Sequence, residues 1–166
     1  RVVATPDPKA ATAAHKGTHS IGVALFQRGS ASLPGLGGAL AHQVRRGLPA
    51  PPSDAAWDFL SIAMAVFAAD RFILRKEAAD DWVRVIALNV AVSDSARWKP
   101  LADRLSKTLR FLTGDIWTVT FSSGGAKAPK FQSKFTDRNA VCLFSGGLDS
   151  LLGALKLLDD GLRPLL

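Results

Sequence analysis

The sequence predicts an α/β protein, with an α+β N-terminal domain followed by the first strand, loop and helix of a parallel-sheet domain. Between residues 21 and 122, apolar residues recur with strand and helix periods in turn. Near the end of the chain, an apolar run over 139–144 leads into two adjacent glycines and a leucine-rich helical pattern. A strand, a glycine turn and a helix in this order are typical of the opening of a βαβ unit.

The composition is that of a chain that buries a core. Hydrophobic residues make up 48% and charged residues 21% of the 166 residues, which excludes a disordered chain. No apolar run is long enough to span a bilayer, and residues 1–20 lack the apolar centre of a signal peptide. We therefore expect a cytoplasmic protein with no membrane partner. A single cysteine, Cys142, excludes an internal disulfide and a cysteine-rich zinc site in this stretch.

The two ends of the sequence indicate a piece of a longer protein. The first residue is Arg1 instead of methionine, and a new apolar run has only begun at 162–166. We expect the domain that starts near residue 138 to be truncated.

The first fifty residues show little periodic pattern. Residues 1–20 contain two prolines and many small side chains, so an irregular segment is expected there. A short strand is expected at 21–26, and a long loop at 28–52, where glycine and proline are frequent.

Clearer elements follow. The periods predict a helix over 55–75 that Ser53 or Asp54 caps, a strand over 82–92, a helix over 95–112 that Gly114 ends, and a strand over 116–121. Trp82, Trp98 and Trp117 lie on apolar faces and are assigned to the core. The expected domains are an irregular segment (1–20), the α+β domain (21–122), a linker (123–137) and the start of the truncated domain (138–166).

Positive charge is concentrated on one predicted helix. The chain has 21 basic and 14 acidic residues, a net charge of +7, which fits nucleic acid, a polyphosphate ligand or simply a solvated surface. The polar face of the helix over 95–112 carries five cations: Arg97, Lys99, Arg104, Lys107 and Arg110. They suit phosphate contacts, but such a row is more often the solvated side of an amphipathic helix.

The segment with the most specific chemistry is Ser145-Gly146-Gly147-Leu148-Asp149-Ser150. A pyrophosphate group needs several inward donors and a backbone that can approach closely. Glycines have no Cβ to block the approach, and the helix that follows points free N–H groups and its positive dipole end into the same place. Asp149 would be repelled by phosphates unless Mg²⁺ lies between them, or unless it caps the helix.

Other candidate sites fit less well. No lysine follows the glycines, which excludes a Walker-type phosphate loop. The stretch 35–40 is only a faint dinucleotide fingerprint without a strand–helix context. His15 and His19 lack a third ligand, so we expect them to be surface residues. Cys142 lies inside the expected strand and is expected to be a small core residue instead of a nucleophile.

At residues 144–150 the chain resembles the PP-loop ATP pyrophosphatase superfamily (adenine nucleotide alpha hydrolase-like fold), and most of all its 7-cyano-7-deazaguanine synthase (QueC)-like branch. Upstream, the segments 57–60, 68–71 and 111–117 resemble the domain that precedes the QueC-like part of the Qat anti-phage defence protein (QatC). The superfamily motif is short and specific, and the upstream likeness spans most of residues 50–122.

The resemblance implies an enzyme that uses ATP to adenylate a carboxylate or carbonyl oxygen and releases pyrophosphate, before a nucleophile displaces AMP. Carried over, the loop residues Phe144, Ser145, Gly146, Gly147, Leu148, Asp149 and Ser150 would bind ATP, and Mg²⁺ would share the charge at Asp149. No catalytic base is assigned. A zinc site of the QueC type is implied only for a missing C-terminal part, and protein partners would come from a defence operon.

Two alternatives remain open at this point. One is a tRNA-modifying PP-loop enzyme, although nucleic acid is not the favoured partner. The other is a non-catalytic interaction module whose loop has lost turnover. In every case a single strand and helix cannot close a nucleotide site, so we expect these 166 residues alone to be inactive.

Overall fold

A computed structural model describes residues 1–16, 19–48, 50–132 and 137–165. The chain divides into two compact units, which are described separately. Unit 1 comprises Arg1–Gln43 and Pro52–Ala128, and unit 2 comprises Val44–Pro51 and Pro129–Leu166.

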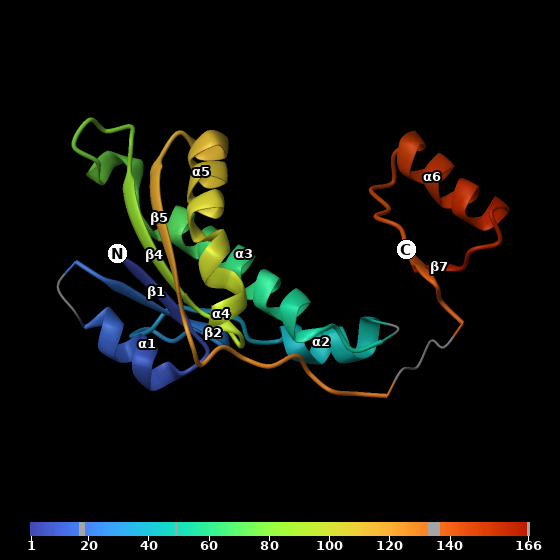
Figure 1. Ribbon diagram of the computed structural model, residues 1–166, viewed down its shortest axis with the longest axis horizontal. Helices are drawn as coiled ribbons and strands as arrows, with labels where there is room; N and C mark the ends of the chain where they lie inside the picture. The colour runs from blue at the N-terminus through green and yellow to red at the C-terminus, as the bar shows by residue number, and fades with distance from the viewer. Residues whose placement is uncertain (17–18, 49, 133–136, 166) are drawn as a thin grey trace. The chain divides into compact units, whose positions relative to one another are not determined.

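Unit 1 is built on a five-stranded sheet with the order β3-β2-β1-β4-β5 (Figure 1). Its strands are β1 (Val2–Thr5), β2 (Ile21–Gln27), β3 (Gly35–Gly37), β4 (Val85–Ala91) and β5 (Ile116–Ser122). All four pairings are parallel, so the overall α/β class is confirmed and the α+β description of this domain is wrong. Alternating apolar residues reveal a strand but not its direction, which explains the error.

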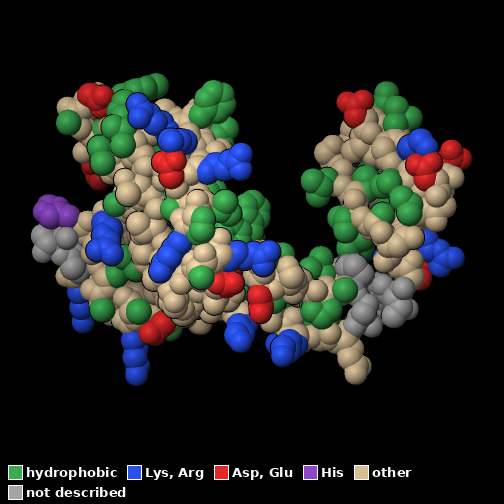
Figure 2. Space-filling model, viewed as in Figure 1, with side chains coloured by type: hydrophobic (Ala, Val, Ile, Leu, Met, Phe, Trp, Pro, Cys, Tyr) green, Lys and Arg blue, Asp and Glu red, His purple; other side chains and the backbone are tan. Residues whose placement is uncertain are grey.

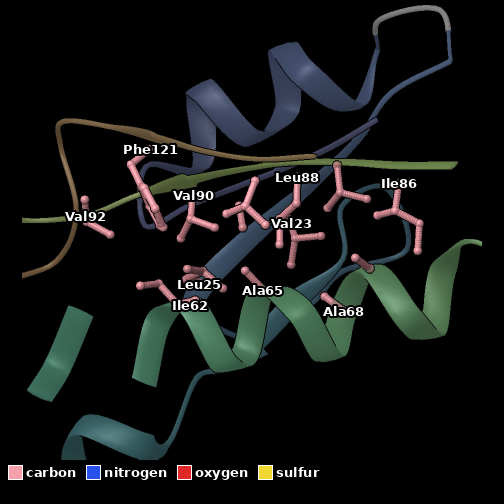
Figure 3. Packing of buried hydrophobic residues seen from close by; sticks show 14 of the residues in the cluster. Val23, Leu25, Ile62, Ala65, Ala68, Ile86, Leu88, Val90, Val92 and Phe121 are labelled. Atoms are coloured by element: carbon pink, nitrogen blue, oxygen red, sulfur yellow. The ribbon is translucent and has the colours of Figure 1, made fainter. Parts of the chain in front are cut away.

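The helices lie on both faces of the sheet. Helix α1 (Pro8–His15) joins β1 to β2. The connection from β3 to β4 contains α2 (Leu40–Gly47) and α3 (Asp54–Phe72). The connection from β4 to β5 contains α4 (Ser95–Trp98) and α5 (Ala102–Thr113). Short 3₁₀ turns occupy Arg75–Glu77 and Lys99–Leu101. Figure 3 shows the main core between the sheet and α3, with α1 on the opposite face.

The expected irregular segment at 1–20 is wrong. It contains β1, which is the central strand, and α1, whose N-cap is Asp7 and whose first residue is Pro8. A four-residue strand is too short to show a period, and Pro8 is well suited to a first helical position. The glycine of β2 allows close packing, because a Cβ at Gly22 would stand 1.8 Å from the carbonyl oxygen of Ala11.

Several other predictions hold with changed boundaries. The Ser53 hydroxyl caps α3 by accepting from the N–H of Ala56 at 3.1 Å, and Gly114 ends α5 at a φ of +76°. The helix expected over 95–112 is broken into α4, a 3₁₀ turn and α5, because Pro100 has no N–H for a continuous helix. The long loop expected at 28–52 contains β3 and α2.

Two of the three tryptophans assigned to the core are buried. Trp98 and Trp117 pack in the core of unit 1, whereas Trp82 is 68% exposed. The Trp82 ring instead lies under the Arg75 guanidinium, 5.4 Å from the ring centre. The core assignment of Trp82 is therefore wrong, because its strand begins only at Val85.

Unit 2 holds a small βαβ arrangement. Strand β6 (Ala140–Val141), helix α6 (Leu148–Asp159) and strand β7 (Pro164–Leu165) follow one another, and the two strands pair in parallel. The expected order of strand, glycine turn, helix and strand is confirmed, but the first strand is shorter than 139–144. No helix in the described ranges is long and apolar enough to cross a membrane.

Candidate functional site

The loop of residues 145–150 lies where β6 has ended and α6 begins. Its side chains are exposed except for Ser150, which is half-buried. In parallel α/β sheets this edge, beyond the carboxyl ends of the strands, is where ligands bind. The structure therefore places the predicted loop at an accessible position of the expected kind.

The backbone of the loop depends on glycine at one position. Gly146 has a φ of +83°, in the left-handed region that side-chain-bearing residues avoid. Gly147 is extended and serves as the N-cap of α6, and a Cβ there would meet only the Ser145 hydroxyl oxygen, at 3.7 Å. Gly146 is thus required by the turn itself, whereas Gly147 leaves open space beside the helix end.

The two serine hydroxyls of the loop are joined. The Ser150 hydroxyl donates to the carbonyl oxygen of Gly147 at 2.8 Å, and the Ser145 hydroxyl donates to the Ser150 oxygen at 3.3 Å. This chain of hydrogen bonds holds both side chains over the first turn of α6. Both hydroxyls can rotate toward an anion at the same spot, because a hydroxyl proton is free to turn.

Free backbone donors lie at the same helix end. The N–H of Leu151 makes the first bond of α6, to the carbonyl oxygen of Gly147 at 3.1 Å. The N–H groups of residues 148–150 come before that bond and therefore have no partner within the helix. Together with the helix dipole they form a positive end that favours a bound anion.

Asp149 is an exposed residue in the first turn of α6 and does not cap the helix. The N-cap is Gly147, which makes no side-chain bond, so the capping explanation of Asp149 is wrong. In the described part of the chain, no three His, Cys, Asp or Glu residues gather as a metal site. One carboxylate beside a phosphate site fits Mg²⁺, which is bound through one or two carboxylates plus substrate phosphates.

Phe144, just before the loop, and Leu148, within it, contribute no polar side-chain groups. Their side chains are 47% and 70% exposed. Cys142 follows the last residue of β6 and is only half-buried, so the expectation of a core residue inside the strand is wrong, although its N–H donates to the carbonyl oxygen of Leu165 at 2.9 Å. The adjacent Leu143 is 91% exposed, which the expectation of a buried strand did not foresee.

Helix α6 exposes apolar side chains that a helix normally buries. The exposed leucines are Leu148, Leu151, Leu152, Leu155 and Leu158. A helix that is apolar around most of its circumference is a buried helix in its native surroundings. Two short strands do not supply that surface.

Unit 1 has a buried polar cluster beside the carboxyl end of β4. The buried Asp58 carboxylate accepts from the N–H and hydroxyl of Ser93, at 2.7 and 2.9 Å, and from the Trp98 indole at 3.0 Å. Across the end of β4, the N–H of Gly125 donates to the carbonyl oxygen of Val92 at 3.0 Å. The first part of the expected linker therefore packs on the carboxyl end of β4, within unit 1.

A second polar cluster lies at the opposite, amino-terminal ends of β4 and β5. The Arg84 guanidinium contacts the Asp115 carboxylate at 2.6 Å, with 4% and 0% of the two side chains exposed, and Arg75 contacts Asp115 at 3.1 Å. Burial alone would raise the pKa of Asp115, but hydrogen bonds from the Arg84 side chain and backbone outweigh it and hold that pKa below its usual value. Because these groups satisfy one another, the cluster is structural.

A charged residue within an apolar segment was a sequence signal for each of the two buried clusters, although hydrophobic periodicity did not identify the clusters. Asp58 interrupts an apolar helix and Arg84 shares a face with apolar strand residues. A charged residue on an apolar face is almost always paired when buried. The partners, however, are distant in the sequence: 14 and 31 residues from Arg84, and 35 and 40 residues from Asp58, so spacing does not reveal them.

The structure does not support the other candidate sites, which are the glycine-rich stretch 35–40 and the two histidines. The stretch 35–40 does connect β3 to α2, so the objection that it lacks a strand–helix context is wrong. Its glycines nevertheless pack on the chain itself, since a Cβ at Gly38 would stand 2.7 Å from the Arg28 nitrogen. His15 is half-buried and His19 exposed, and neither joins a metal cluster among the described residues.

Comparison of the chain with protein-family models, curated proteins and solved structures gave no match.

Proposed function

We propose that the loop of residues 145–150 binds the pyrophosphate part of ATP and that unit 2 belongs to a QueC-like adenylating enzyme. The observation that carries the proposal is the convergence of three kinds of donor at one accessible helix end. These are the N–H groups before the first bond of α6, the Ser145 hydroxyl and the Ser150 hydroxyl. The positive φ of Gly146 turns the chain so that they converge.

The proposed reaction begins when a carboxylate or carbonyl oxygen of the substrate attacks the α-phosphorus of ATP. A new P–O bond forms, the bond to the bridging oxygen breaks, and pyrophosphate leaves with that electron pair. A nitrogen nucleophile then attacks the activated carbon, AMP leaves with the oxygen, and an amide results. A nitrile requires a second ATP, which adenylates the amide oxygen before AMP leaves with that oxygen and the nitrogen loses its protons. The loop holds the phosphates throughout, so its contribution is positioning and charge stabilisation.

Each loop residue has a defined part in this proposal. The Ser145 and Ser150 hydroxyls exchange their mutual hydrogen bond for bonds to phosphate oxygens. Gly147 allows the phosphate to approach the backbone, and Asp149 would hold Mg²⁺, which supplies charge neutralisation when bound. Phe144 and Leu148 border the phosphate site with apolar side chains.

The exposed leucines of α6 support a nucleotide site that needs more protein than unit 2 contains. We infer that further strands cover α6 and supply the adenine and ribose contacts, and that the 166 residues alone do not turn over ATP. Membership of an anti-phage defence system, with partners from its operon, rests on the resemblance of residues 50–122 and is part of the same proposal. So is a zinc site outside this sequence.

A tRNA-modifying PP-loop enzyme is the second candidate function. The exposed cations of α4 and α5 favour it, since phosphate contacts dominate RNA affinity. Binding of tRNA that requires both these cations and the loop would favour this candidate over the QueC-like one.

The test is conversion of radiolabelled ATP to AMP and pyrophosphate by the longest natural form of the chain. We expect turnover that Asp149→Ala and the pair Ser145→Ala/Ser150→Ala abolish. The matched control is Ser30→Ala/Ser32→Ala, which removes a hydroxyl pair of the same 3.3 Å separation in unit 1 and leaves turnover unchanged. Release of ADP, or turnover unaffected by the loop variants, would contradict the proposal, and absence of turnover would favour a non-catalytic module.

A further inference from the structure

Helix α5 carries an exposed aromatic side chain in its last turn. The buried side of the helix, with Leu105 and Leu109, packs against the core of unit 1. On the outer side, Arg104, Lys107 and Phe111 follow one another at helical spacings of three and four residues. Phe111 is 89% exposed, so it contributes almost nothing to the fold.

Several cations precede Phe111 in the same stretch of chain. Between residues 95 and 113 the chain has five cations and one carboxylate, Asp103, so this stretch has a charge of +4. Arg104 and Arg110 make no ion pair with any described residue, and the Lys107–Asp103 pair is about three-quarters exposed on both sides, where such pairs contribute little. Figure 2 shows Lys and Arg side chains next to apolar ones over α5.

An exposed aromatic ring among free cations fits a single-stranded nucleic acid. Cations contact the phosphates, and an aromatic ring stacks on an unpaired base, which every base permits because each has a π face. A membrane surface fits less well, because a helix that lies in a bilayer uses its apolar face, and the apolar face of α5 is covered by the core.

We propose that unit 1 binds single-stranded nucleic acid through Arg104, Lys107, Arg110 and Phe111. This activity goes beyond the proposed adenylation and does not involve the loop of residues 145–150. The binding surface, here called the α5 stripe, consists of these four residues. Phe111 stacks on a base, while the cations contact neighbouring phosphates.

The test is fluorescence anisotropy of the 166-residue chain with a fluorescein-labelled oligothymidine at low salt. We expect saturable binding. A plot of the logarithm of the association constant against the logarithm of the salt concentration should have a slope of about −2, since each of three phosphate contacts contributes about −0.7 on single strands. Arg104→Glu/Arg110→Glu weakens binding by about tenfold or more. Lys9→Glu/Lys16→Glu makes the same change of charge at two exposed positions, one in α1 and one at its C-cap, and is expected to change affinity by about twofold or less.

Stacking is tested separately from charge. Phe111→Ala is expected to weaken binding by about tenfold, within the range that base–aromatic stacking supplies, and Phe111→Trp to retain it. Leu112→Ala, which removes a neighbouring side chain that is 70% exposed, is the matched control and leaves affinity unchanged. Circular dichroism verifies the fold of each variant, and Arg104→Gln/Arg110→Gln replaces the charge-reversed pair if that pair unfolds.

Several outcomes would overturn the proposal. They are absence of binding, an equal loss in the α1 control, unchanged affinity in Phe111→Ala, and equal binding of a duplex. Binding to vesicles containing phosphatidylserine, without binding to the oligonucleotide, would show that the stripe contacts a membrane. Because the loop is not involved, Ser145→Ala/Ser150→Ala retains oligonucleotide binding whether or not adenylation is confirmed.

Discussion

The Ser150 hydroxyl donates a hydrogen bond to the carbonyl oxygen of Gly147, 2.8 Å away, at the first turn of α6. This bond fixes the serine side chain beside the free N–H groups of the helix end, and the Ser145 hydroxyl donates to the same serine oxygen. The donors are thus gathered before a ligand arrives. Such preorganisation reduces the cost of ordering side chains on binding.

Replacing Gly146 tests the backbone of the loop. Gly146→Ala is expected to destabilise the loop by about 1–2 kcal/mol, the cost of a left-handed conformation for a residue with a Cβ. Because unit 2 is small, the loss should be visible as faster amide hydrogen exchange over residues 145–151. Gly153→Ala, in the interior of α6 with open space around its Cα, is the control and is expected to slow exchange. Identical exchange in Gly146→Ala and the unchanged chain would mean that the turn does not require glycine.

The buried pair of Arg84 and Asp115 should be a main determinant of the stability of unit 1. Asp115→Ala leaves the Arg84 guanidinium buried without its main partner, which is expected to cost about 3–5 kcal/mol in the free energy of unfolding. Urea denaturation followed by tryptophan fluorescence measures it. Asp103→Ala, which breaks only the exposed pair with Lys107, should cost less than about 1 kcal/mol. Equal losses of unfolding free energy in the two variants would show that the buried pair contributes no more to stability than the exposed pair.

The same pair predicts a dependence of stability on acid. The folded pKa of Asp115 lies below its ordinary value of 3.8, so the contribution of this carboxylate is present above that value and is lost as the pH falls through the folded pKa. The urea midpoint of the unchanged chain should therefore drop more steeply below about pH 4 than that of Asp115→Asn. Parallel curves for the two proteins would contradict this account of the acid sensitivity.

The packing of residues 123–128 on unit 1 depends on the absence of a side chain at Gly125. A Cβ there would stand 2.3 Å from the Val92 carbonyl carbon, so Gly125→Ala should dislodge the segment from the end of β4. We expect a loss of about 1–3 kcal/mol, typical of overpacking, and faster proteolysis near residues 123–132. Gly47→Ala, at a position with nothing within 4 Å, should leave the cleavage rate unchanged. Unchanged cleavage in Gly125→Ala would show that the segment does not need this contact.

Local patterns predicted the elements that are long and periodic. Helix α3, strand β5 and the end of α5 at Gly114 lie close to their expected places, because hydrophobic period and caps are local signals. The loop of residues 145–150 was found for the same reason, since its glycines, serines and flanking elements are consecutive. The short β1 gave no period and was missed.

Features that depend on distant contacts could not be predicted. The parallel direction of the sheet, the hydrogen bonds of the buried Asp58 and the pairing of Arg84 with Asp115 each join residues that lie tens of positions apart. Proline at position 100 was a local signal, and it accounts for the break between α4 and α5.

The most direct test of the pyrophosphate site is a titration of the isotopically labelled chain with magnesium pyrophosphate, followed by the backbone amide resonances. We predict that shifts concentrate on residues 145–151, that they saturate, and that Ser145→Ala/Ser150→Ala removes them while Ser30→Ala/Ser32→Ala does not. Shifts spread over the cations of unit 1 with none in the loop, or no shifts at millimolar pyrophosphate, would contradict the account.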